Sequence, residues 1–235
     1  MPLILLLETA TNICSIALAQ DSELLSFRET DIKNSHSEYI TVFIDEALTE
    51  AGIDITSIDA IGISMGPGSY TGLRIGVSVA KGLCYALSIP LIAINTLRSM
   101  AKGAANEFSD QAKNDRPFLV PMIDARRMEV YSAIYDFNNN EIRSTQADII
   151  IESSFDEYIK DQQLILFGNG AAKCKQLFSS KPGIIINDSF QLSSRFMIPL
   201  ALDLFKRGEF ENVAYFEPFY LKDFIAGKPT VKGLH

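Results

Sequence analysis

Histidine is scarce in this chain of 235 residues, which contains two, and tryptophan is absent. One of the two histidines, His235, is the last residue of the sequence, which leaves His36 as the single imidazole elsewhere. Metal hydrolases and many acid–base enzymes use two or more positioned imidazoles. The scarcity of histidine therefore nearly excludes a mechanism of that kind.

Cysteine pairs and long apolar runs are also missing. Cys14, Cys84 and Cys174 lie far apart and form no C-x-x-C motif, which is typical of free thiols in a reducing compartment. The apolar run at residues 3–7 ends at Glu8 and is too short for a transmembrane helix or for the core of a signal peptide. The sequence therefore predicts a cytoplasmic protein that does not associate with a membrane.

Positive charge is outnumbered, because 21 lysines and arginines stand against 29 aspartates and glutamates, for a net charge of −8. Such a chain is repelled by a phosphate backbone unless it has a local basic patch, and its basic residues are scattered along the sequence. We expect no nucleic-acid-binding surface that works by itself. Hydrophobic residues make up 47% and charged residues 21%, the balance of a globular protein.

The first half of the chain alternates strand and helix patterns. Strand patterns cover residues 3–9, 13–19, 23–29, 58–65 and 90–94. A capping box at Ser35 and Glu38 begins an amphipathic helix that runs to Ala51, and a second helix pattern covers residues 71–87. The first three strands form a meander, and the remaining elements alternate.

The second half repeats this order. Strand patterns cover residues 117–123, 128–136, 142–149, 163–167 and 183–187, and helix patterns cover 153–160, a segment from about 171, and 193–207. The polar stretch 102–116 shows no apolar periodicity and is typical of a domain boundary. We therefore predict a duplicated α/β unit, with one domain at residues 1–108 and the other at 109–235.

A glycine-rich loop, Gly66-Pro67-Gly68-Ser69, lies between a predicted strand and a predicted helix. Glycines let backbone N–H groups approach an anion, and the start of a helix adds a partial positive charge. The loop is neither a Walker A motif nor a G-x-G-x-x-G motif. Gly66, Gly68 and Ser69 are therefore candidate cofactor residues, and a tight structural turn is an equally good interpretation.

The helix after this loop carries Gly72, Gly76 and Ala80 at intervals of four residues, although each glycine costs about 1 kcal/mol in a helix interior. Small residues let another helix approach closely, either the helix at 35–51 or one from a second chain. The candidate partner interface comprises His36, Tyr39, Ile40, Phe43, Gly72, Ile75, Gly76, Val79, Ala80 and Leu83. A homodimer through the same two helices is a further expectation, because an isolated chain would expose an apolar patch.

Four segments resemble the TsaB (YeaZ) family: ETATNICSIAL, GPGSYTGLRIGVSVAKGL, IDARRMEVYSA and EPFYL. The resemblance runs along nearly the whole chain and implies an actin-like ATPase (ASKHA) fold with two similar βββαβα-type subdomains. It also implies a non-catalytic subunit that pairs with the homologous catalytic subunit TsaD and the ATPase TsaE. The implied reaction transfers threonylcarbamoyl to N6 of adenosine 37 in tRNAs that decode ANN codons, with the tRNA reached only through the complex.

Several motifs of the catalytic relatives are altered here. Thr96-Leu97-Arg98-Ser99-Met100 matches the His-x-Glu-Gly-His segment whose imidazoles bind a metal in the paralogue, and a hydroxyl and a thioether are poor substitutes. The two Asp-x-Gly turns of the superfamily are replaced by Glu8-Thr9-Ala10 and Asp124-Ala125-Arg126, without the glycine. We expect no metal, no catalysis and no tightly bound cofactor. Binding of ATP or ADP at the interface of the complex remains an alternative.

Three smaller features each have two interpretations. Gly168-Asn169-Gly170 resembles the turn that faces adenosine in relatives, and it is equally a turn from strand to helix. His36 is expected to be a surface or interface residue. Asp124, Arg126, Arg127 and Glu129 form a charge cluster that is either a solvated strand edge or a set of internal ion pairs, or that orients a partner or a tRNA. The competing functions are a nucleotide-dependent kinase or ATPase and, less well supported, a glycoprotease-type metallopeptidase.

Overall fold

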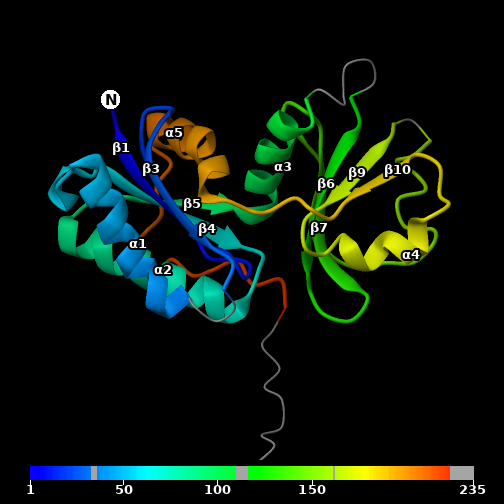
Figure 1. Ribbon diagram of the computed structural model, residues 1–235, viewed down its shortest axis with the longest axis horizontal. Coiled ribbons are helices and arrows are strands. Elements are labelled where there is room, and N and C mark those ends of the chain that lie inside the picture. The colour runs from blue at the N-terminus through cyan, green and yellow to red at the C-terminus, as the bar shows by residue number, and fades with distance from the viewer. Residues whose placement is uncertain (33–35, 110–115, 161, 223–235) are drawn as a thin grey trace, which may run out of the picture.

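Two lobes stand side by side in the computed structural model, which describes residues 1–32, 36–109, 116–160 and 162–222 (Figure 1). The sheet of the first lobe contains β1 (Leu3–Glu8), β2 (Cys14–Gln20), β3 (Glu23–Thr30), β4 (Ala60–Gly66) and β5 (Leu91–Asn95). Its order is β3-β2-β1-β4-β5. The first three strands are an antiparallel meander, and β4 and β5 run parallel to β1.

The sheet of the second lobe repeats this plan. It contains β6 (Phe118–Asp124), β7 (Glu129–Tyr135), β8 (Glu141–Ile149), β9 (Leu164–Phe167) and β10 (Ile184–Asn187). Its order is β10-β9-β6-β7-β8, with an antiparallel meander of β6, β7 and β8 and with β9 and β10 parallel to β6. The predicted duplication of an α/β unit is confirmed.

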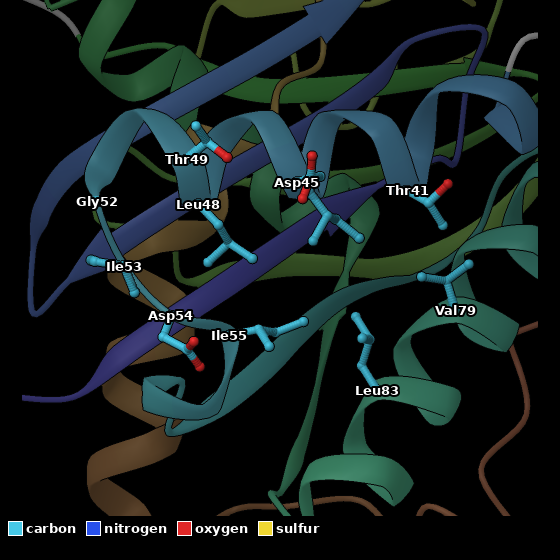
Figure 2. Close-up of a pocket in the computed structure, with 11 residues that line it drawn as sticks. Thr41, Asp45, Leu48, Thr49, Gly52, Ile53, Asp54, Ile55, Val79 and Leu83 are labelled. Carbon is cyan, nitrogen blue, oxygen red and sulfur yellow. The ribbon is translucent and has the colours of Figure 1, made fainter.

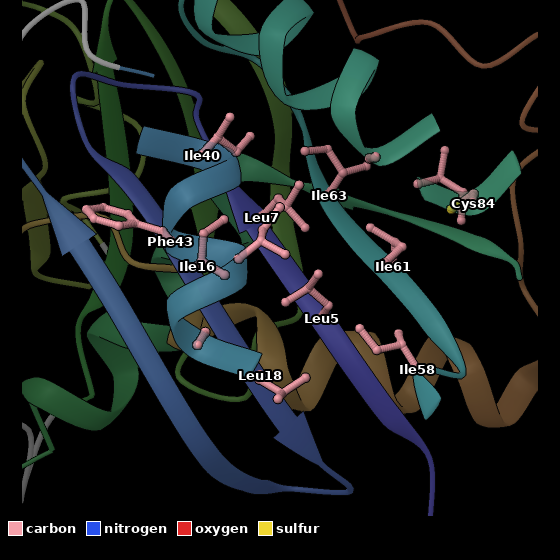
Figure 3. Close-up of a cluster of buried hydrophobic side chains, with 14 of the residues drawn as sticks. Leu5, Leu7, Ile16, Leu18, Ile40, Phe43, Ile58, Ile61, Ile63 and Cys84 are labelled. Carbon is pink, nitrogen blue, oxygen red and sulfur yellow. The ribbon is translucent and has the colours of Figure 1, made fainter. Parts of the chain in front are cut away.

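Side chains of β1 alternate between the two faces of the first sheet, as a strand requires. Leu5 and Leu7 pack with Ile40 of α1 (His36–Ala51) and with residues of α2 (Tyr70–Leu87) (Figure 3). Ile4 and Leu6 face the opposite side and pack against α5 (Ile198–Arg207). Because both faces are covered, the strand is a continuous apolar run.

Each lobe sends its last helix towards the other lobe. Helix α3 (Thr96–Glu107) follows the first sheet and packs against β6 and β7, whereas α5 follows the second sheet and packs against β5 and β1. The chain after α5 returns to the first lobe, where Phe219 N–H donates to the carbonyl of Met65 at 2.7 Å, and then reaches the second lobe, where Lys222 pairs with Glu129. The expected division at residue 108 therefore separates the two sheets, but α5 and the chain as far as Phe219 pack on the first lobe.

Two expectations about helices differ from the structure. Residues 153–160 form consecutive turns, because Phe155 has a φ of +72° that no regular right-handed helix includes. Helix α3 was not expected, because its inner face is built from small residues such as Ala101 and Ala104, and Gly103 lies directly against the ring of Phe196. The predicted cap at Ser35 falls outside the described residues.

The shorter elements are η1 (Ile55–Ser57), η2 (Ala172–Cys174), α4 (Lys175–Phe178) and η3 (Ser194–Met197). Cys14, Cys84 and Cys174 are free and buried, as predicted. In the described part of the chain, no helix combines the length and the apolar character needed to cross a bilayer.

Candidate partner-binding surface and interlobe cleft

The glycine-rich loop packs on the turn that follows β1. A Cβ atom added at Gly68 would lie 2.4 Å from the carbonyl oxygen of Ala10, and one added at Gly66, where φ is +115°, would lie 2.8 Å from the carbonyl oxygen of Phe219. Ser69 N–H donates to the Ala10 carbonyl at 2.7 Å, and the Ser69 hydroxyl caps α2. The candidate cofactor residues Gly66, Gly68 and Ser69 thus contact the backbone of their own chain.

The ridge of small residues on α2 faces inward. A Cβ atom at Gly72 would lie 2.2 Å from the carbonyl oxygen of Thr9, and one at Gly76 would lie 2.2 Å from the Thr9 hydroxyl and 3.0 Å from a methyl group of Ile63. Ala80 is fully buried. Gly72 and Gly76 therefore allow α2 to approach its own sheet and the turn after β1, whereas Ala80 lies in the core cluster that α1 also joins, as the packing of these two helices within one chain predicts.

Three expected interface residues of α1 are also buried. His36 is 7% exposed, and its Nε2 lies 3.2 Å from the carbonyl oxygen of Ile13 on the β1–β2 connection. Ile40 and Phe43 belong to the core cluster beneath α1. His36 is therefore not the exposed imidazole that was expected, because the first turn of α1 packs onto the first sheet, and its place in a partner interface stays a prediction.

The remaining expected interface residues lie on the outer side of the two helices. Tyr39, Ile75, Val79 and Leu83 are half-buried and pack only partly against the core. Tyr85 of α2 is 85% exposed and Val42 of α1 is 46% exposed. The outer surface of α1 and α2 is therefore more apolar than a solvated pair of helices requires.

An apolar groove of about 480 Å³ separates α1 from α2 at this surface and ends at η1 (Figure 2). Its apolar lining consists of Ile44, Leu48, Ile53, Ile55, Val79 and Leu83. Polar side chains of α1, Thr41, Asp45 and Thr49, stand on one rim. Sequence reasoning missed Ile53 and Ile55, although their alternation with Gly52 and Asp54 directly after the helix marks a segment with one apolar side.

The first of the two Asp-x-Gly positions, Glu8, points into the protein. Its side chain is fully buried, and Oε1 accepts hydrogen bonds from Ala10 N–H at 2.7 Å and from the Ser64 hydroxyl at 2.8 Å. Burial, reinforced by the nearby Glu29, raises the pKa of the Glu8 carboxyl to about 7, although the two hydrogen bonds oppose this shift. The carboxyl is therefore directed at its own chain and not at the cleft.

The second of these positions, Asp124, is also engaged within its lobe. Its carboxylate accepts a hydrogen bond from Arg126 N–H at 2.7 Å and pairs with Lys173, and its N–H donates to the Asn169 side chain at 3.0 Å. These contacts fix the turn between β6 and β7. In the described part of the chain, no group of three or more His, Cys, Asp or Glu side chains gathers as a set of metal ligands.

The segment Thr96–Met100 joins the lobes. Thr96 and Met100 are buried one turn apart on α3, and a Cβ atom at Gly168 would lie 2.4 Å from the terminal methyl of Met100. Arg98 Nε donates to the Asn139 side-chain oxygen at 3.1 Å, and the Asn139 amide donates back to the Arg98 carbonyl at 3.1 Å. Side chains at these positions therefore pack α3 against the second sheet.

The cleft between the lobes retains a cavity of about 200 Å³, below the roughly 300–1,000 Å³ of usual ligand pockets. Its walls include Thr11 and Asn12 of the first lobe and Gly168 and Asn169 of the second. A Cβ atom at Gly170 would lie 2.9 Å from the carbonyl carbon of Ile123, so tight packing accounts for the last glycine of the Gly168–Gly170 turn.

Two related sheets, exchanged helices and a cleft between lobes define a two-subdomain α/β protein of the actin-like fold. The family model of TsaD, tRNA N6-adenosine threonylcarbamoyltransferase, matches residues 30–218. The tRNA threonylcarbamoyladenosine biosynthesis protein TsaB of Escherichia coli is 32% identical over 232 residues, 96% of each chain. The chain belongs to the TsaB (YeaZ) family.

Two further relatives extend this comparison. A crystal structure of a Pseudomonas aeruginosa protein, described as similar to peptidase YeaZ, has a TM-score of 0.82 and 27% identity and covers 94% of this chain and all of its own. The tRNA N6-adenosine threonylcarbamoyltransferase of Syntrophobacter fumaroxidans is 33% identical over 125 residues, which are 53% of this chain and 36% of that protein. The resemblance thus extends to a protein described as a transferase.

Proposed function

We propose that this chain acts in the synthesis of threonylcarbamoyladenosine on tRNA, as a non-catalytic cytoplasmic subunit that pairs with a TsaD-type catalytic homologue. The complex, with a TsaE-type ATPase, would transfer threonylcarbamoyl to N6 of adenosine 37 in tRNAs that decode ANN codons. The observation that carries this proposal is the contrast between a cleft filled by the chain's own residues and an apolar groove left on the outer side of α1 and α2.

The groove favours a protein partner because its lining is aliphatic and its rim is polar, as in the core and rim of protein interfaces. Val79 and Leu83 are one turn apart on α2, so a helix of the partner can lie across both. A homologous catalytic subunit would carry a related pair of helices, and two related surfaces can meet about an approximate twofold axis. Two copies of this chain would use the same surface, so a homodimer would compete with the heterodimer.

The cleft supports the non-catalytic part of the proposal. A kinase or ATPase needs carboxylates that face the nucleotide, whereas Glu8 binds Ala10 and Ser64, and Asp124 binds Lys173. Backbone carbonyl groups of Thr9 and Ala10 occupy the space beside the glycine-rich loop. We propose that the chain holds no cofactor tightly by itself and that any ATP or ADP lies at the interface with the partner.

Reconstitution of the tRNA modification tests the proposal. The catalytic homologue, the ATPase, threonylcarbamoyl donor and an ANN-decoding tRNA transcript are combined with and without this chain, and threonylcarbamoyladenosine is measured by mass spectrometry of the digested tRNA. We expect product only when the chain is present and no ATP hydrolysis by the chain alone. Equal product without the chain, or rapid ATP turnover by the purified chain, would overturn the proposal.

A further inference from the structure

The turn between β6 and β7 places two adjacent arginines in an unfavourable backbone conformation. Arg126 has a φ of +70° and Arg127 a φ of +49°, in the left-handed region that glycine and asparagine tolerate best. A residue of another type costs roughly 1 kcal/mol or more at such a position. Backbone stability alone would therefore favour glycine or asparagine at both positions. The presence of arginine there points to a role for the arginine side chains.

Lys173 of η2 holds this turn in place through hydrogen bonds and an ion pair. Its ammonium group donates to the carbonyl oxygens of Arg127 at 2.8 Å and of Glu129 at 2.7 Å, and it pairs with Asp124. Both arginine side chains are exposed, and within the described residues neither guanidinium has a hydrogen bond or an ion pair. The turn is therefore held rigidly, while two positive side chains extend into solvent.

The end of the described chain brings aromatic rings to the same region. Lys222 pairs with Glu129, the first residue of β7, and Tyr220, two residues earlier, lies 5.1 Å from Tyr70 between ring centres. The pair thus brings the end of the described chain to the strand that follows the arginine turn, and Tyr220 precedes this pair by two residues. The Arg74 guanidinium lies 5.2 Å from the centre of the Tyr70 ring.

Two contacts link the arginine turn to the start of α2: Lys222 pairs with Glu129 after the turn, and Tyr220 packs on Tyr70 of α2. We call the residues around this link the arginine–tyrosine surface: Tyr70, Arg74, Arg126, Arg127, Glu129, Tyr220 and Lys222. Four of its residues are cationic in a chain whose net charge is −8. Lys222 is paired with Glu129, so among the described residues Arg74, Arg126 and Arg127 supply its unneutralised positive charge. Tyr220 is 39% exposed.

We propose that the arginine–tyrosine surface binds single-stranded or loop RNA, with Arg126 and Arg127 on phosphates and an unpaired base against Tyr220. Guanidinium groups match phosphate geometry, and loop RNA is recognised by stacking of splayed bases on aromatic rings. The inference rests on the proposed function, because the RNA would be the tRNA presented to the catalytic partner. A free nucleotide fits less well, because the lining of the cleft cavity contains neither arginine.

The test replaces both arginines with asparagine, which tolerates a positive φ and carries no charge. Binding of an ANN-decoding tRNA transcript to the complex of this chain with the catalytic homologue is followed by fluorescence anisotropy at several salt concentrations. For Arg126→Asn/Arg127→Asn we expect about tenfold weaker binding and a salt dependence whose slope is smaller by about 1.5. The unfolding temperature should stay unchanged or rise, because the turn is relieved of strain.

A double variant of equal charge, Lys206→Asn/Arg207→Asn at the end of α5, is the control and should bind tRNA within about twofold of the wild type. The proposal is overturned if the arginine variant retains wild-type affinity, if it loses the catalytic subunit in gel filtration, or if it loses affinity for ATP and not for RNA. If the wild-type complex does not form, the proposed function fails separately. The same RNA titration is then made with the chain alone. A tenfold difference in affinity between the wild type and the arginine variant supports the proposed RNA site, and equal affinities overturn it.

Discussion

The cleft between the lobes and the outer side of α1 and α2 differ in what fills them. In the cleft, backbone groups of Thr9 and Ala10 contact the glycines of the loop and of α2, and a cavity of about 200 Å³ is left. Between α1 and α2, aliphatic side chains line about 480 Å³ of open groove. The two regions differ in that the cleft is closed by packing within the chain, whereas the outer side of α1 and α2 leaves apolar side chains exposed.

The inner and outer sides of α2 show the same contrast between tight packing and open space. The inner side of α2 has no room for a methyl group at Gly72 or Gly76, whereas a Cβ atom at Gly82, on the exposed side, meets nothing within 4 Å. Glycine is therefore required by packing at the first two positions and not at the third. Substitutions at these positions separate the part of α2 that builds the lobe from the part that faces solvent.

The largest expected effect on stability comes from adding a methyl group on the inner side of α2. Gly72→Ala would place a methyl group 2.2 Å from the carbonyl oxygen of Thr9, and backbone cannot move aside as a side chain can. We expect the free energy of unfolding to fall by roughly 3 kcal/mol. Urea denaturation followed by circular dichroism measures it, and a loss below about 1 kcal/mol would show that α2 does not depend on this contact.

The buried carboxyl of Glu8 gives the next effect, which depends on pH. Its pKa is raised from 4.5 to about 7 by burial, so the folded state holds a proton that the unfolded chain releases above pH 4.5. Stability attributable to this group is therefore full below pH 4.5 and is lost as the pH rises through 7. Glu8→Gln keeps the acceptor for Ala10 and Ser64 and removes the ionisation.

Urea denaturation of both proteins at pH 4, 6 and 8 makes this comparison. At pH 8 the variant should be more stable than the wild type by roughly 2–3 kcal/mol, and at pH 4 the two should be nearly equal. Parallel stability profiles would mean that the pKa of the Glu8 carboxyl is not raised in the folded protein and would contradict this account.

The smallest effect belongs to the exposed side of α2. Gly82→Ala adds a methyl group in open space within a helix, so the free energy of unfolding should rise by about 0.5–1 kcal/mol. Thermal unfolding of Gly82→Ala and Gly72→Ala, measured in parallel, shows whether the two substitutions change the stability in opposite directions. A destabilising Gly82→Ala would show that the two sides of α2 are equally constrained and would remove the contrast.

Much of the fold follows from apolar periodicity, because strands covered on both faces are continuous apolar runs and α1 and α2 carry clear helical stripes. The duplicated strand order was predicted in this way and is confirmed. Helix α3 escaped prediction because small residues make up most of its buried side, where Leu97 and Met100 are the large apolar side chains. The turns at 153–160 escaped because the left-handed conformation of Phe155 leaves no trace in periodicity.

The candidate site was predicted less completely. Sequence spacing located α1 and α2 but could not tell their inner sides from their outer sides, so it left open whether Gly72 and Gly76 pack within the chain or against a second one, and the structure shows both against Thr9 of their own chain. The direction in which a small-residue ridge faces depends on the neighbouring sheet. Likewise, only the folded chain brings Lys222 to Glu129, beside the two arginines of the β6–β7 turn.

One matched pair of substitutions tests the central claim, that this chain works through the α1–α2 surface and not through its cleft. Thr41 and Asn12 are both exposed polar residues, the first lining the groove and the second lining the cleft. Affinity for the TsaD-type subunit is measured by calorimetry for Thr41→Arg and Asn12→Arg. We expect at least about a 100-fold loss for Thr41→Arg, because a bulky charge blocks the groove, and a change within about twofold for Asn12→Arg. Undiminished affinity of Thr41→Arg, together with a large loss for Asn12→Arg, would contradict the account.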